Sequence, residues 1–296
     1  MQKFPNIFQN LRKNENLGKY LNFGCGGSAE LLFRPETLEE LQEFMKSRDR
    51  SQKITVLGGG TNMLVRDGGV DGVTILTRGL NRIALVDGNI VAESGVANAR
   101  LFSFAKNLGI RGFEFLGCLA GTVGGACAMN AGCYGSEIKD VLVSLEVLDF
   151  DGRVHSLSVA DCSMGYRKNN LPKNLVFSRA TFRADRSGDR KELEEIFRKM
   201  LTEKLRTQPL DEKTCGCTFK NPPDIPAWRV IKDLGLQGVD LGGARFSEKH
   251  ANFLVNHAGA TATDLENLID LARSRAREEM KVNLELEIEV VGNASQ

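Results

Sequence analysis

The sequence predicts an α+β fold with mixed sheets, on three observations. Before residue 207, short apolar runs alternate with amphipathic stretches of helical period. Two Asp-Gly pairs, at 87–88 and 151–152, lie between apolar runs and are typical of β-hairpin turns. Further helix and strand patterns follow residue 207. Hairpins mixed with strand–helix–strand units indicate α+β rather than a wholly parallel sheet.

Five stretches have the apolar spacing of an amphipathic helix. Thr37 and Glu40 form a predicted capping box at the start of the first, and Thr263 and Glu266 form one at the start of the last. Gly109 is expected to end the second, because glycine readily takes the left-handed conformation found at helix ends. The predicted helices span 35–46, 98–108, 189–206, 226–234 and 263–280.

The predicted strands are short apolar runs bounded by turn residues. From 284 to 290, apolar residues alternate with glutamates, so one face of that strand is expected to be buried and the other solvated. Residues 1–21 are expected to form a helix and a loop. The predicted strands are the end of 22–33, then 54–57, 73–76, the hairpin 81–95, 141–150, 154–157, 175–178, 180–182, 241–247, 251–256 and 284–290.

Length and charge narrow the classes of function. A chain of 296 residues is expected to form two or three domains. Its 39 basic and 38 acidic side chains leave a net charge of +1, which gives no reason to expect nucleic acid or a membrane surface as partner. No apolar run approaches the roughly 20 residues that span a bilayer, and the start lacks the apolar core of a signal peptide. We therefore expect a cytoplasmic protein, and a monomer.

Cysteine and histidine usage argues against metal binding. The seven cysteines are an odd number in a long chain, which is typical of thiols in a reducing compartment. Cys215 and Cys217 have the wrong spacing for a zinc site, and the three histidines are scattered. We expect no metal site.

Two glycine-rich stretches stand out. Six of the nineteen residues from 117 to 135 are glycine and most of the others are small. A second glycine run, 58–60, directly follows the predicted strand 54–57. Glycine at this density permits tight turns and close approach of the backbone to a phosphate or a flat ring. A surface loop rich in glycine is the alternative interpretation.

Five motifs in chain order resemble the UDP-N-acetylenolpyruvoylglucosamine reductase (MurB) family of flavoenzymes in peptidoglycan precursor synthesis. The resemblance covers nearly the whole chain, and the order of the motifs makes it specific. The motifs are L-G-G-G-T-N-M-L-V at 57–65, G-T-V-G-G-A at 121–126 with M-N-A-G-C-Y-G at 129–135, G-Y-R at 165–167, G-C-T-F-K-N-P at 216–222 and L-E-L-E at 284–287.

The resemblance implies an FAD-binding region of the vanillyl-alcohol-oxidase (PCMH) type and a C-terminal α+β substrate-binding domain. We assign the two FAD-binding subdomains to 1–77 and 78–204 and the substrate domain to 205–287. The terminal strand, 288–296, is expected to return to the second subdomain. The short interval between Arg167 and Cys217 has no tyrosine-bearing insertion, which resembles the type II subgroup.

The implied reaction uses two cofactors, FAD and NADPH. NADPH reduces FAD, and flavin N5 delivers hydride to the enolpyruvyl group of UDP-N-acetylglucosamine enolpyruvate, giving UDP-N-acetylmuramate. The residues implied to bind FAD are Gly58, Gly59, Gly60, Thr61, Asn62, Met63, Leu116, Gly117, Gly121, Thr122, Gly124, Gly125, Ala126, Met129, Asn130, Ala131 and Gly132.

Three residues are implied to be catalytic. Arg167 would bind the substrate carboxylate and stabilise developing charge, for which a guanidinium is well suited. Glu287 would be the carboxyl group beside it, although three alternating glutamates are usually the solvated face of a strand. Cys217 stands where the family usually carries serine as proton donor, and an unperturbed thiol is mostly protonated at pH 7. A packed thiol is the alternative for Cys217.

The remaining implied contacts are with the nucleotide sugar. The substrate diphosphate would be bound by basic side chains, with the choice between Lys204 and Arg206 left open. His250 stands where the family carries a polar substrate contact, with a half-buried structural histidine as the alternative. The implied substrate-binding residues are Tyr166, Lys204, Arg206, Lys220, Asn221 and His250.

Two other functions stay open from the sequence. One is an FAD oxidoreductase of the same fold that acts on an alcohol or a sugar, with flavin tethered through Cys127 or Cys133. The other is a flavin- or nucleotide-binding module without turnover. Flavin retained after acid precipitation would favour the first, and a flavin that NADPH does not bleach would favour the second.

Overall fold

The computed structural model describes residues 10–295, which divide into two compact units. Unit 1 comprises the described residues up to Arg12, Leu32–Gly59 and Gly72–Thr202; unit 2 comprises Lys13–Leu31, Gly60–Asp71 and the chain from Glu203 onward. Helices and strands are mixed in both, so the α+β prediction is confirmed. The finer division at 77/78 and 204/205 stays a prediction.

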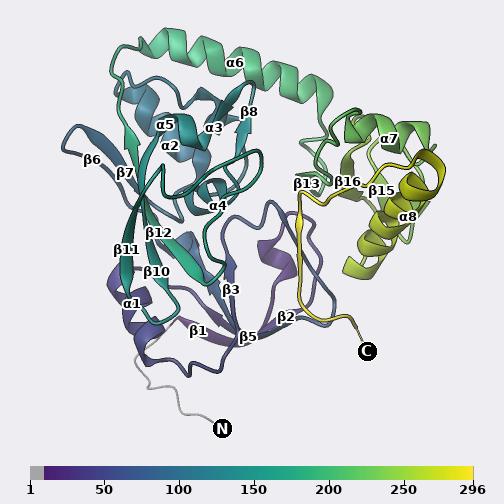
Figure 1. Ribbon diagram of the computed structural model, residues 1–296, viewed down its shortest axis with the longest axis horizontal. Helices are drawn as coiled ribbons and strands as arrows, with labels where there is room; N and C mark the ends of the chain where they lie inside the picture. Colours follow the sequence, from purple (N-terminus) through teal and green to yellow (C-terminus); the bar gives the residue numbers. More distant parts are fainter. Residues whose placement is uncertain (1–9, 296) are drawn as a thin grey trace. The chain divides into compact units, whose positions relative to one another are not determined.

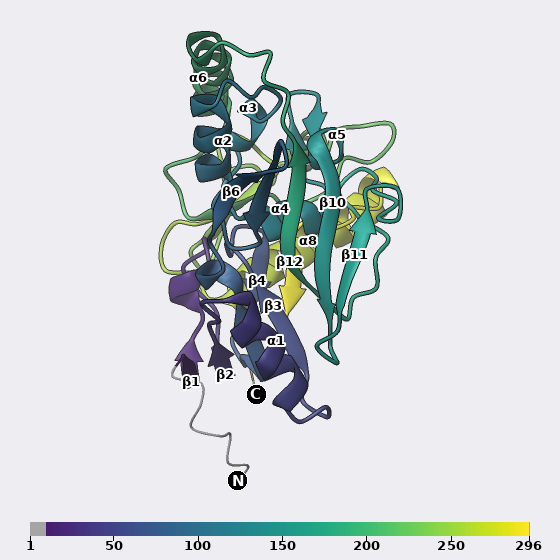
Figure 2. The same ribbon diagram turned by 90° about the vertical axis from the view of Figure 1, so that its left-hand side faces the viewer.

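Unit 1 contains a five-stranded antiparallel sheet, whose strands lie side by side in Figure 2. Asp87 and Gly88 lie in the hairpin turn between the strands 83–86 and 89–93. Both have positive φ, at 47° and 77°, as this type of turn requires. The predicted hairpin is therefore confirmed. In sheet order the strands are β11 (Val154–Ser158), β10 (Leu142–Asp149), β12 (Leu175–Arg183), β7 (Asn89–Glu93) and β6 (Ile83–Val86).

Short helices cover this sheet, and α4 packs directly against β12 and β7. Their apolar side chains form one buried cluster, in which the rings of Phe113 and Phe182 meet edge to face at 5.8 Å. Gly109 has φ +67° just after the second of the predicted helices. The elements are α2 (Asn98–Asn107), α3 (Glu114–Gly117), α4 (Val123–Ala128), α5 (Ile138–Val141), the long α6 (Arg190–Thr207), and the pair β8 (Gly132–Cys133) and β9 (Ser136–Glu137).

A second sheet has the order β1 (Leu11–Asn16), β2 (Ser28–Phe33), β5 (Val70–Leu76), β3 (Ile54–Leu57), and β3 pairs with β5 in parallel. Helix α1 (Leu38–Ser47) begins after Thr37, whose side chain accepts from Glu40 N as predicted. The Glu40 side chain accepts from Glu36 N rather than from Thr37 N, so only half of the predicted capping box forms. The single turns η1 (Gly18–Tyr20) and η2 (Thr77–Gly79) follow β1 and β5. The helix expected within 1–21 is wrong for residues 11–16, which form β1; residues 1–9 lie outside the described chain.

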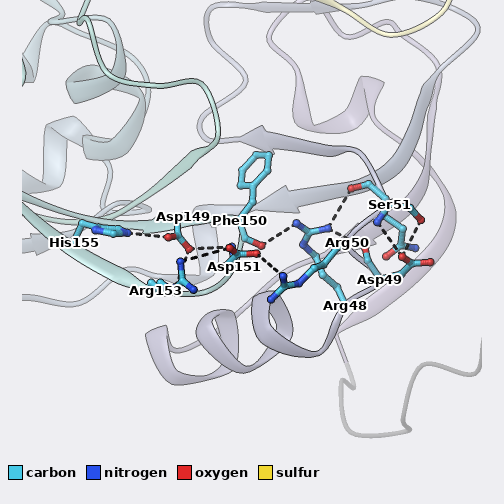
Figure 3. A network of polar contacts seen from close by, with 10 residues as sticks. Arg48, Asp49, Arg50, Ser51, Asp149, Phe150, Asp151, Arg153 and His155 are labelled. Atoms are coloured by element: carbon cyan, nitrogen blue, oxygen red, sulfur yellow. Dashed lines mark hydrogen bonds and ion pairs between the residues drawn. The ribbon is translucent and has the colours of Figure 1, made fainter.

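A polar network anchors the turn that leads into β3 (Figure 3). The guanidinium of Arg48 is buried and donates to the carbonyl oxygens of Asp49, Gln52 and Phe150. Around it, Arg50 pairs with Asp151 at 3.4 Å, but this exposed ion pair contributes little. Arg48 thus joins the α1–β3 turn to the β10–β11 turn, and it fixes the strand from which the first glycine run emerges.

Unit 2 is built on a four-stranded sheet with α8 packed against β14, β15, β16 and α7 (Figure 1). Its core includes Phe23 and Leu64, which come from segments far from the C-terminal part of the chain. The elements are β13 (Thr214–Cys217), α7 (Ala227–Asp233), β14 (Asp240–Leu241), β15 (Ala244–Phe246), β16 (Phe253–Asn256) and α8 (Ala262–Met280).

The predicted terminal strand 284–290 is not one strand. Residues 285–287 lie along 218–220, and only β17 (Glu289–Val291) forms a regular ladder, in parallel with β4 (Met63–Val65). The expected return of 288–296 to residues 78–204 is therefore corrected. The partner is 63–65, because Val290 packs on the same apolar cluster as Leu64.

The capping box at the start of α8 is formed by a different residue pair from the predicted Thr263 and Glu266. Thr261 and Asp264 form the box, with Thr261 Oγ1 accepting from Asp264 N at 3.1 Å and Asp264 Oδ2 accepting from Thr261 N at 2.9 Å. Thr263 instead donates its hydroxyl to Asp67, and Glu266 forms a bidentate pair with Arg66. The sequence thus contains two overlapping Thr-x-x-acid patterns, at 261–264 and 263–266. Because Thr263 and Glu266 bind Asp67 and Arg66, the pattern at 261–264 caps the helix.

Candidate functional site

The two glycine runs touch each other in unit 1. A Cβ atom at Gly59 would lie 2.7 Å from Gly121 Cα, and one at Gly58 would lie 2.8 Å from Thr122 Oγ1. Real Cβ contacts are not that short, so both positions require glycine. The structure therefore brings together the end of β3 and the entry to α4.

Arg78 holds the first glycine run in place. Its side chain donates to the carbonyl oxygens of Gly58, at 3.2 Å, and of Gly59, at 2.5 Å. Hydrogen bonds from a charged donor are stronger than those between neutral groups. Because glycine has wide conformational freedom, an external clamp of this kind is needed to keep the run in one conformation.

A pocket of about 410 Å³ opens beside this contact. The described residues that line it include two guanidinium groups, those of Arg78 and Arg100, and no acidic side chain. Arg100 is oriented by its hydrogen bond to Asn81 O, at 2.6 Å. Two cations beside glycine backbone are the chemistry that binds a phosphate or diphosphate. The lining residues are Gly59, Arg78, Asn81, Gly95, Ala97, Arg100, Gly121 and Thr122.

Two buried hydroxyls near the pocket fit a polar cofactor. Thr122 Oγ1 and Ser94 Oγ are buried and have no hydrogen-bond partner among residues 10–295. An unsatisfied buried hydroxyl is unfavourable, so it usually marks a partner outside the chain. Cations, glycine backbone and these hydroxyls together match the phosphates and hydroxyls of FAD.

Some predicted FAD contacts have a packing role that the structure shows. Leu116 is fully buried in the apolar cluster of unit 1. A Cβ at Gly117 would lie 2.6 Å from the Phe102 ring, and one at Gly124 would lie 2.7 Å from Ser94 Cβ. Packing alone thus accounts for glycine at 117 and 124, and their contact with FAD stays a prediction.

Asn130 links the second glycine stretch to the Arg167 turn. It is fully buried with φ +44°, and its amide nitrogen donates to Gly165 O and to Glu137 Oε2, both at 3.0 Å. Its Oδ1 accepts from Lys139 N. The side chain is therefore committed to fixing two turns, which positions residues 129–132.

Arg167 is held in a strained conformation at this point. Its φ is +53°, which is rare outside glycine and concentrates at functional sites. The guanidinium donates to Gly132 O at 2.7 Å and lies 5.1 Å from the centre of the Tyr166 ring, which is exposed. Arg167, Tyr166 and the segment 129–132 are thus brought together in unit 1.

A β-bulge presents Cys217 in unit 2. Thr214 pairs with Val255 and Cys217 pairs with Phe253, so β13 has one residue more than β16 between the two pairs. Gly216 has φ +81° in this bulge. Bulges are common beside active sites, where they redirect a side chain. The Cys217 side chain is half-buried.

The Cys217 and Glu287 segments are hydrogen-bonded neighbours. Glu287 N donates to Thr218 O at 2.9 Å, and Lys220 N donates to Glu285 O at 2.8 Å. Thr218 is buried and fixed by Asn252 O, which accepts from its backbone N. Glu287 is half-buried, whereas Glu285 and Glu289 are exposed. Burial therefore distinguishes the predicted glutamate from the two beside it.

The rest of the first glycine loop belongs to unit 2. A Cβ at Gly60 would lie 2.0 Å from Tyr20 O. Met63 O accepts from the Cys215 thiol at 3.6 Å, and Asn62 donates its amide to Glu287 O at 3.0 Å. Residues 60–63, including Thr61, thus lie with the segment that carries Glu287.

The predicted diphosphate ligands have different surroundings. Lys220 Nζ pairs with Glu285 at 2.5 Å, and Asn221 Oδ1 accepts from Ala227 N at the start of α7. Lys204 is buried. Arg206 is exposed and pairs with Glu203 on the same helix. Their binding to substrate stays a prediction.

His250 is half-buried and packs on Phe253, with ring centres 4.6 Å apart. Burial lowers the pKa of His250, so the ring is neutral at pH 7. Nδ1 accepts from Asn252 N, so a proton on this neutral ring lies on Nε2. His250 therefore stabilises the 250–252 turn through this hydrogen bond. Its contact with the substrate stays a prediction.

Several residues near the site were not singled out from the sequence. Arg78, Asn81 and Arg100 line the pocket, Glu137 orients Asn130, and Asn252 fixes Thr218 and Phe219. None lies in a glycine-rich motif, and an isolated arginine or asparagine is usually a surface residue. Of these residues, only Arg78 could have been noticed from its position in the sequence, because it follows the predicted strand 73–76 that comes after the glycine run.

No described helix is long and apolar enough to cross a membrane. No group of three or more histidine, cysteine, aspartate or glutamate side chains within residues 10–295 is arranged to hold a metal ion. All seven cysteines are described, and none is in a disulfide.

Two family models match this chain. One, described as FAD binding domain, matches residues 29–158, which include both glycine runs and the pocket. The other, described as UDP-N-acetylenolpyruvoylglucosamine reductase, C-terminal domain, matches residues 208–291, which include Cys217 and Glu287.

Full-length relatives agree with these models. UDP-N-acetylenolpyruvoylglucosamine reductase of Rickettsia akari is 38% identical over 97% of this chain and 98% of its own length. The protein of the same name in Rickettsia typhi is 39% identical over 99% of both. Among solved structures, the reductase (MurB) from Thermus caldophilus matches with a TM-score of 0.82 and 33% identity, over 94% of this chain and 97% of the other.

Proposed function

The chain belongs to the UDP-N-acetylenolpyruvoylglucosamine reductase (MurB) family, and on this premise we propose that it reduces UDP-N-acetylglucosamine enolpyruvate to UDP-N-acetylmuramate. The reductant is NADPH and the bound cofactor is FAD. The product is a precursor of peptidoglycan. The reaction takes place in the cytoplasm, and the protein acts as a monomer of the type II subgroup.

One observation carries the proposal beyond family membership. Cys217, Glu287 and Asn62 come from three separate segments, and backbone and side-chain hydrogen bonds join these segments within unit 2. A thiol and a carboxyl group are thus held on neighbouring segments of the chain. That pair can serve a reaction in which a proton is delivered beside a negatively charged group.

Three features of the chain would hold FAD. They are the close contact of Gly59 with Gly121, the pocket lined by two arginines, and the buried hydroxyls of Thr122 and Ser94. FAD, when bound, supplies the transfer of two electrons from NADPH to the enolpyruvyl double bond. Arg78 and Arg100 neutralise its phosphates. Thr122 and Ser94 donate hydrogen bonds to its polar atoms.

Arg167 binds the carboxylate of the substrate. Its guanidinium donates to Gly132 O, which fixes its orientation, and the planar guanidinium fork matches the geometry of a carboxylate. Glu287 supplies the carboxyl group beside that anion.

Cys217 donates the proton that completes the reduction. Hydride adds to the methylene carbon, and the thiol proton adds to the adjacent carbon, so the double bond becomes a lactyl group. Solvent then returns a proton to the thiolate. Lys204, Arg206, Lys220 and Asn221 bind the diphosphate, and Tyr166 and His250 contact the nucleotide sugar.

Covalent flavin attachment, as in oxidases of alcohols or sugars, is not favoured. Cys127 is fully buried, and burial raises the pKa of its thiol. A buried, protonated thiol is a poor nucleophile. Cys133 is half-buried and donates to Phe115 O.

The test follows the flavin spectrum in the purified holoprotein. NADPH is expected to bleach the oxidised spectrum under anaerobic conditions. UDP-N-acetylglucosamine enolpyruvate is then expected to restore it and to yield UDP-N-acetylmuramate by mass. Reoxidation by small enolpyruvyl or crotonate-like acids, but not by the nucleotide sugar, would refute the proposed substrate. Flavin that remains with acid-precipitated protein would refute non-covalent binding.

A further inference from the structure

The peptide groups that flank Glu287 are held on both sides by other segments. Its N–H donates to Thr218 O at 2.9 Å, and its C=O accepts from Asn62 Nδ2 at 3.0 Å. The backbone of Asn62 takes part as well, because Asn62 O accepts from Glu289 N at 2.9 Å. Asn62 therefore bonds to the chain on both sides of Ile288.

The side-chain amide of Asn62 extends the hydrogen bonding between β4 and β17 beyond the end of their ladder. The pairing of β4 with β17 begins at Met63 opposite Glu289, one residue beyond Asn62. On the other side, Phe219 pairs with Leu286 in an isolated bridge. Without Asn62, the carbonyl of Glu287 would lose the hydrogen bond that connects it to the glycine loop.

The opposite anchor is rigid. Thr218 is 1% exposed, its N donates to Asn252 O at 2.7 Å, and its Oγ1 accepts from Leu254 N at 3.1 Å. The Glu287 peptide is thus fixed to a buried core residue on one side and to the half-buried Asn62 on the other. The position of the Glu287 backbone depends on both.

We infer that Asn62 is a positioning residue for Glu287: its amide fixes the backbone from which the carboxyl group projects. This inference rests on the proposed role of Glu287 in the reduction. It assigns to Asn62 a role in the step that consumes the nucleotide sugar, apart from any contact with FAD. A small misplacement of a catalytic group is enough to slow a reaction about 100-fold.

The test uses Asn62→Ala and Asn62→Asp in the holoprotein. Both remove the donor, and aspartate keeps the shape. Asn293→Ala is the matched control, because Asn293, two residues beyond β17, also donates its amide to a distant segment, to Asp71 Oδ1 of β5 at 2.9 Å, but away from Glu287. Hydrogen–deuterium exchange of the 284–289 amides is expected to rise about tenfold in both Asn62 variants and to stay unchanged in Asn293→Ala.

The two half-reactions then locate the effect. Reoxidation by the nucleotide sugar is expected to slow about 10- to 100-fold in the Asn62 variants, and to slow more than bleaching of the flavin by NADPH does. In a Glu287→Gln background, Asn62→Ala is expected to cause no further loss, since residues that act through one another are not additive.

Three results would overturn the inference. The first is unchanged exchange of the 284–289 amides in both Asn62 variants. The second is an equal loss of reoxidation rate with and without Glu287→Gln, and the third is weaker FAD binding with both half-reactions slowed alike. If the nucleotide sugar fails to reoxidise even the wild-type flavin, the proposed function is wrong, and the exchange measurement still decides whether Asn62 holds the Glu287 segment.

Discussion

Cys217 reaches its position through one extra residue in β13. The bulge needs Gly216 at φ +81°, a conformation that side chains other than glycine rarely adopt. The thiol follows this bend, and the next residue, Thr218, returns to the buried core. The chain thus places a half-buried thiol directly beside a residue that is fixed in the core.

The proposed proton donor predicts a difference between two substitutions. Cys217→Ser keeps a donor and is expected to retain reoxidation by the nucleotide sugar. Cys217→Ala removes it and is expected to slow that step by about 10²- to 10⁴-fold, the usual contribution of a general acid. Rapid-mixing absorbance of the flavin measures both.

The control for Cys217 is Cys25→Ala, another half-buried cysteine of unit 2. It is expected to leave reoxidation unchanged. Reoxidation of Cys217→Ala as fast as wild type would show that the thiol is not the donor.

Arg78 predicts an effect on cofactor affinity. Arg78→Met removes the hydrogen bonds to Gly58 O and Gly59 O while keeping an unbranched side chain. Bonds from a charged donor contribute about 1.5–3 kcal/mol each, so FAD is expected to bind at least tenfold more weakly. Quenching of flavin fluorescence on binding gives the dissociation constant.

Arg82→Met is the matched control for Arg78, because Arg82 is exposed and does not line the pocket. Its FAD affinity is expected to equal that of wild type. If Arg78→Met also binds FAD as tightly as wild type, the clamp on the glycine run has no role in binding.

At the scale of elements, the start of α8 shows how tertiary contacts complete a helix. Asp67 accepts from Ala262 N and Thr263 N, and Thr261 Oγ1 accepts from Asp264 N. Three of the four N–H groups that a helix leaves without an internal partner are thus satisfied. The loop after β4 is tied to the longest helix of unit 2 by a carboxylate.

Asp67 predicts a pH-dependent contribution to stability. Burial raises the pKa of Asp67, but the hydrogen bonds from the Thr263 side chain and from the N–H groups of Thr263 and Ala262 outweigh it and leave the pKa below its usual value. The stabilisation is therefore present above the unfolded-state pKa of about 3.9 and is lost as pH falls through the lower folded-state pKa.

The measurement is urea unfolding of wild type and Asp67→Asn. At pH 7 the variant is expected to be about 1 kcal/mol less stable, the usual effect of losing a helix cap. The difference is expected to shrink below about pH 4. Asp270→Asn, an exposed carboxylate further along α8, serves as control. An equal difference for Asp67→Asn at all pH values would contradict a charged cap.

At the scale of the whole molecule, the chain builds each unit from separate segments. Unit 2 takes Phe23 and Leu64 into its core, and Asn256 donates its amide to Phe23 O at 2.8 Å. β17 pairs with β4, which also lies outside the C-terminal part of the chain. The C-terminal residues alone therefore lack part of their own core and a partner strand.

This organisation predicts that a fragment of residues 203–296 does not fold. Loss of Phe23 and Leu64 alone removes about 2–5 kcal/mol each, from a stability that is typically about 5–15 kcal/mol. Near-ultraviolet circular dichroism and a urea titration are expected to show no cooperative transition, in contrast to the full chain. A cooperative transition in the fragment would support an independent domain at 205–287.

Local patterns in the sequence predicted much of the fold. The Thr37 cap, the Asp-Gly turn at 87–88 and the β3 strand depend on residues close together in the chain, and the structure has all three. The glycine runs predicted only close approach of the backbone to a phosphate or a flat ring, and FAD itself came from the family resemblance. The cysteine and glutamate segments came from resemblance, and the structure joins them.

Where the local sequence allowed more than one helix cap or strand partner, only the tertiary structure decided which one forms. Thr261 caps α8 rather than Thr263 because Asp67 binds Thr263. The alternating stretch 284–290 is divided between two partners, and Asn62 bonds to Glu287 from 225 residues away. A hydrogen bond between distant segments leaves no periodic trace in the sequence, since either residue alone is compatible with a solvated surface. The motifs thus determined what the chain is built to bind, and long-range contacts decided which side chains hold those motifs in place.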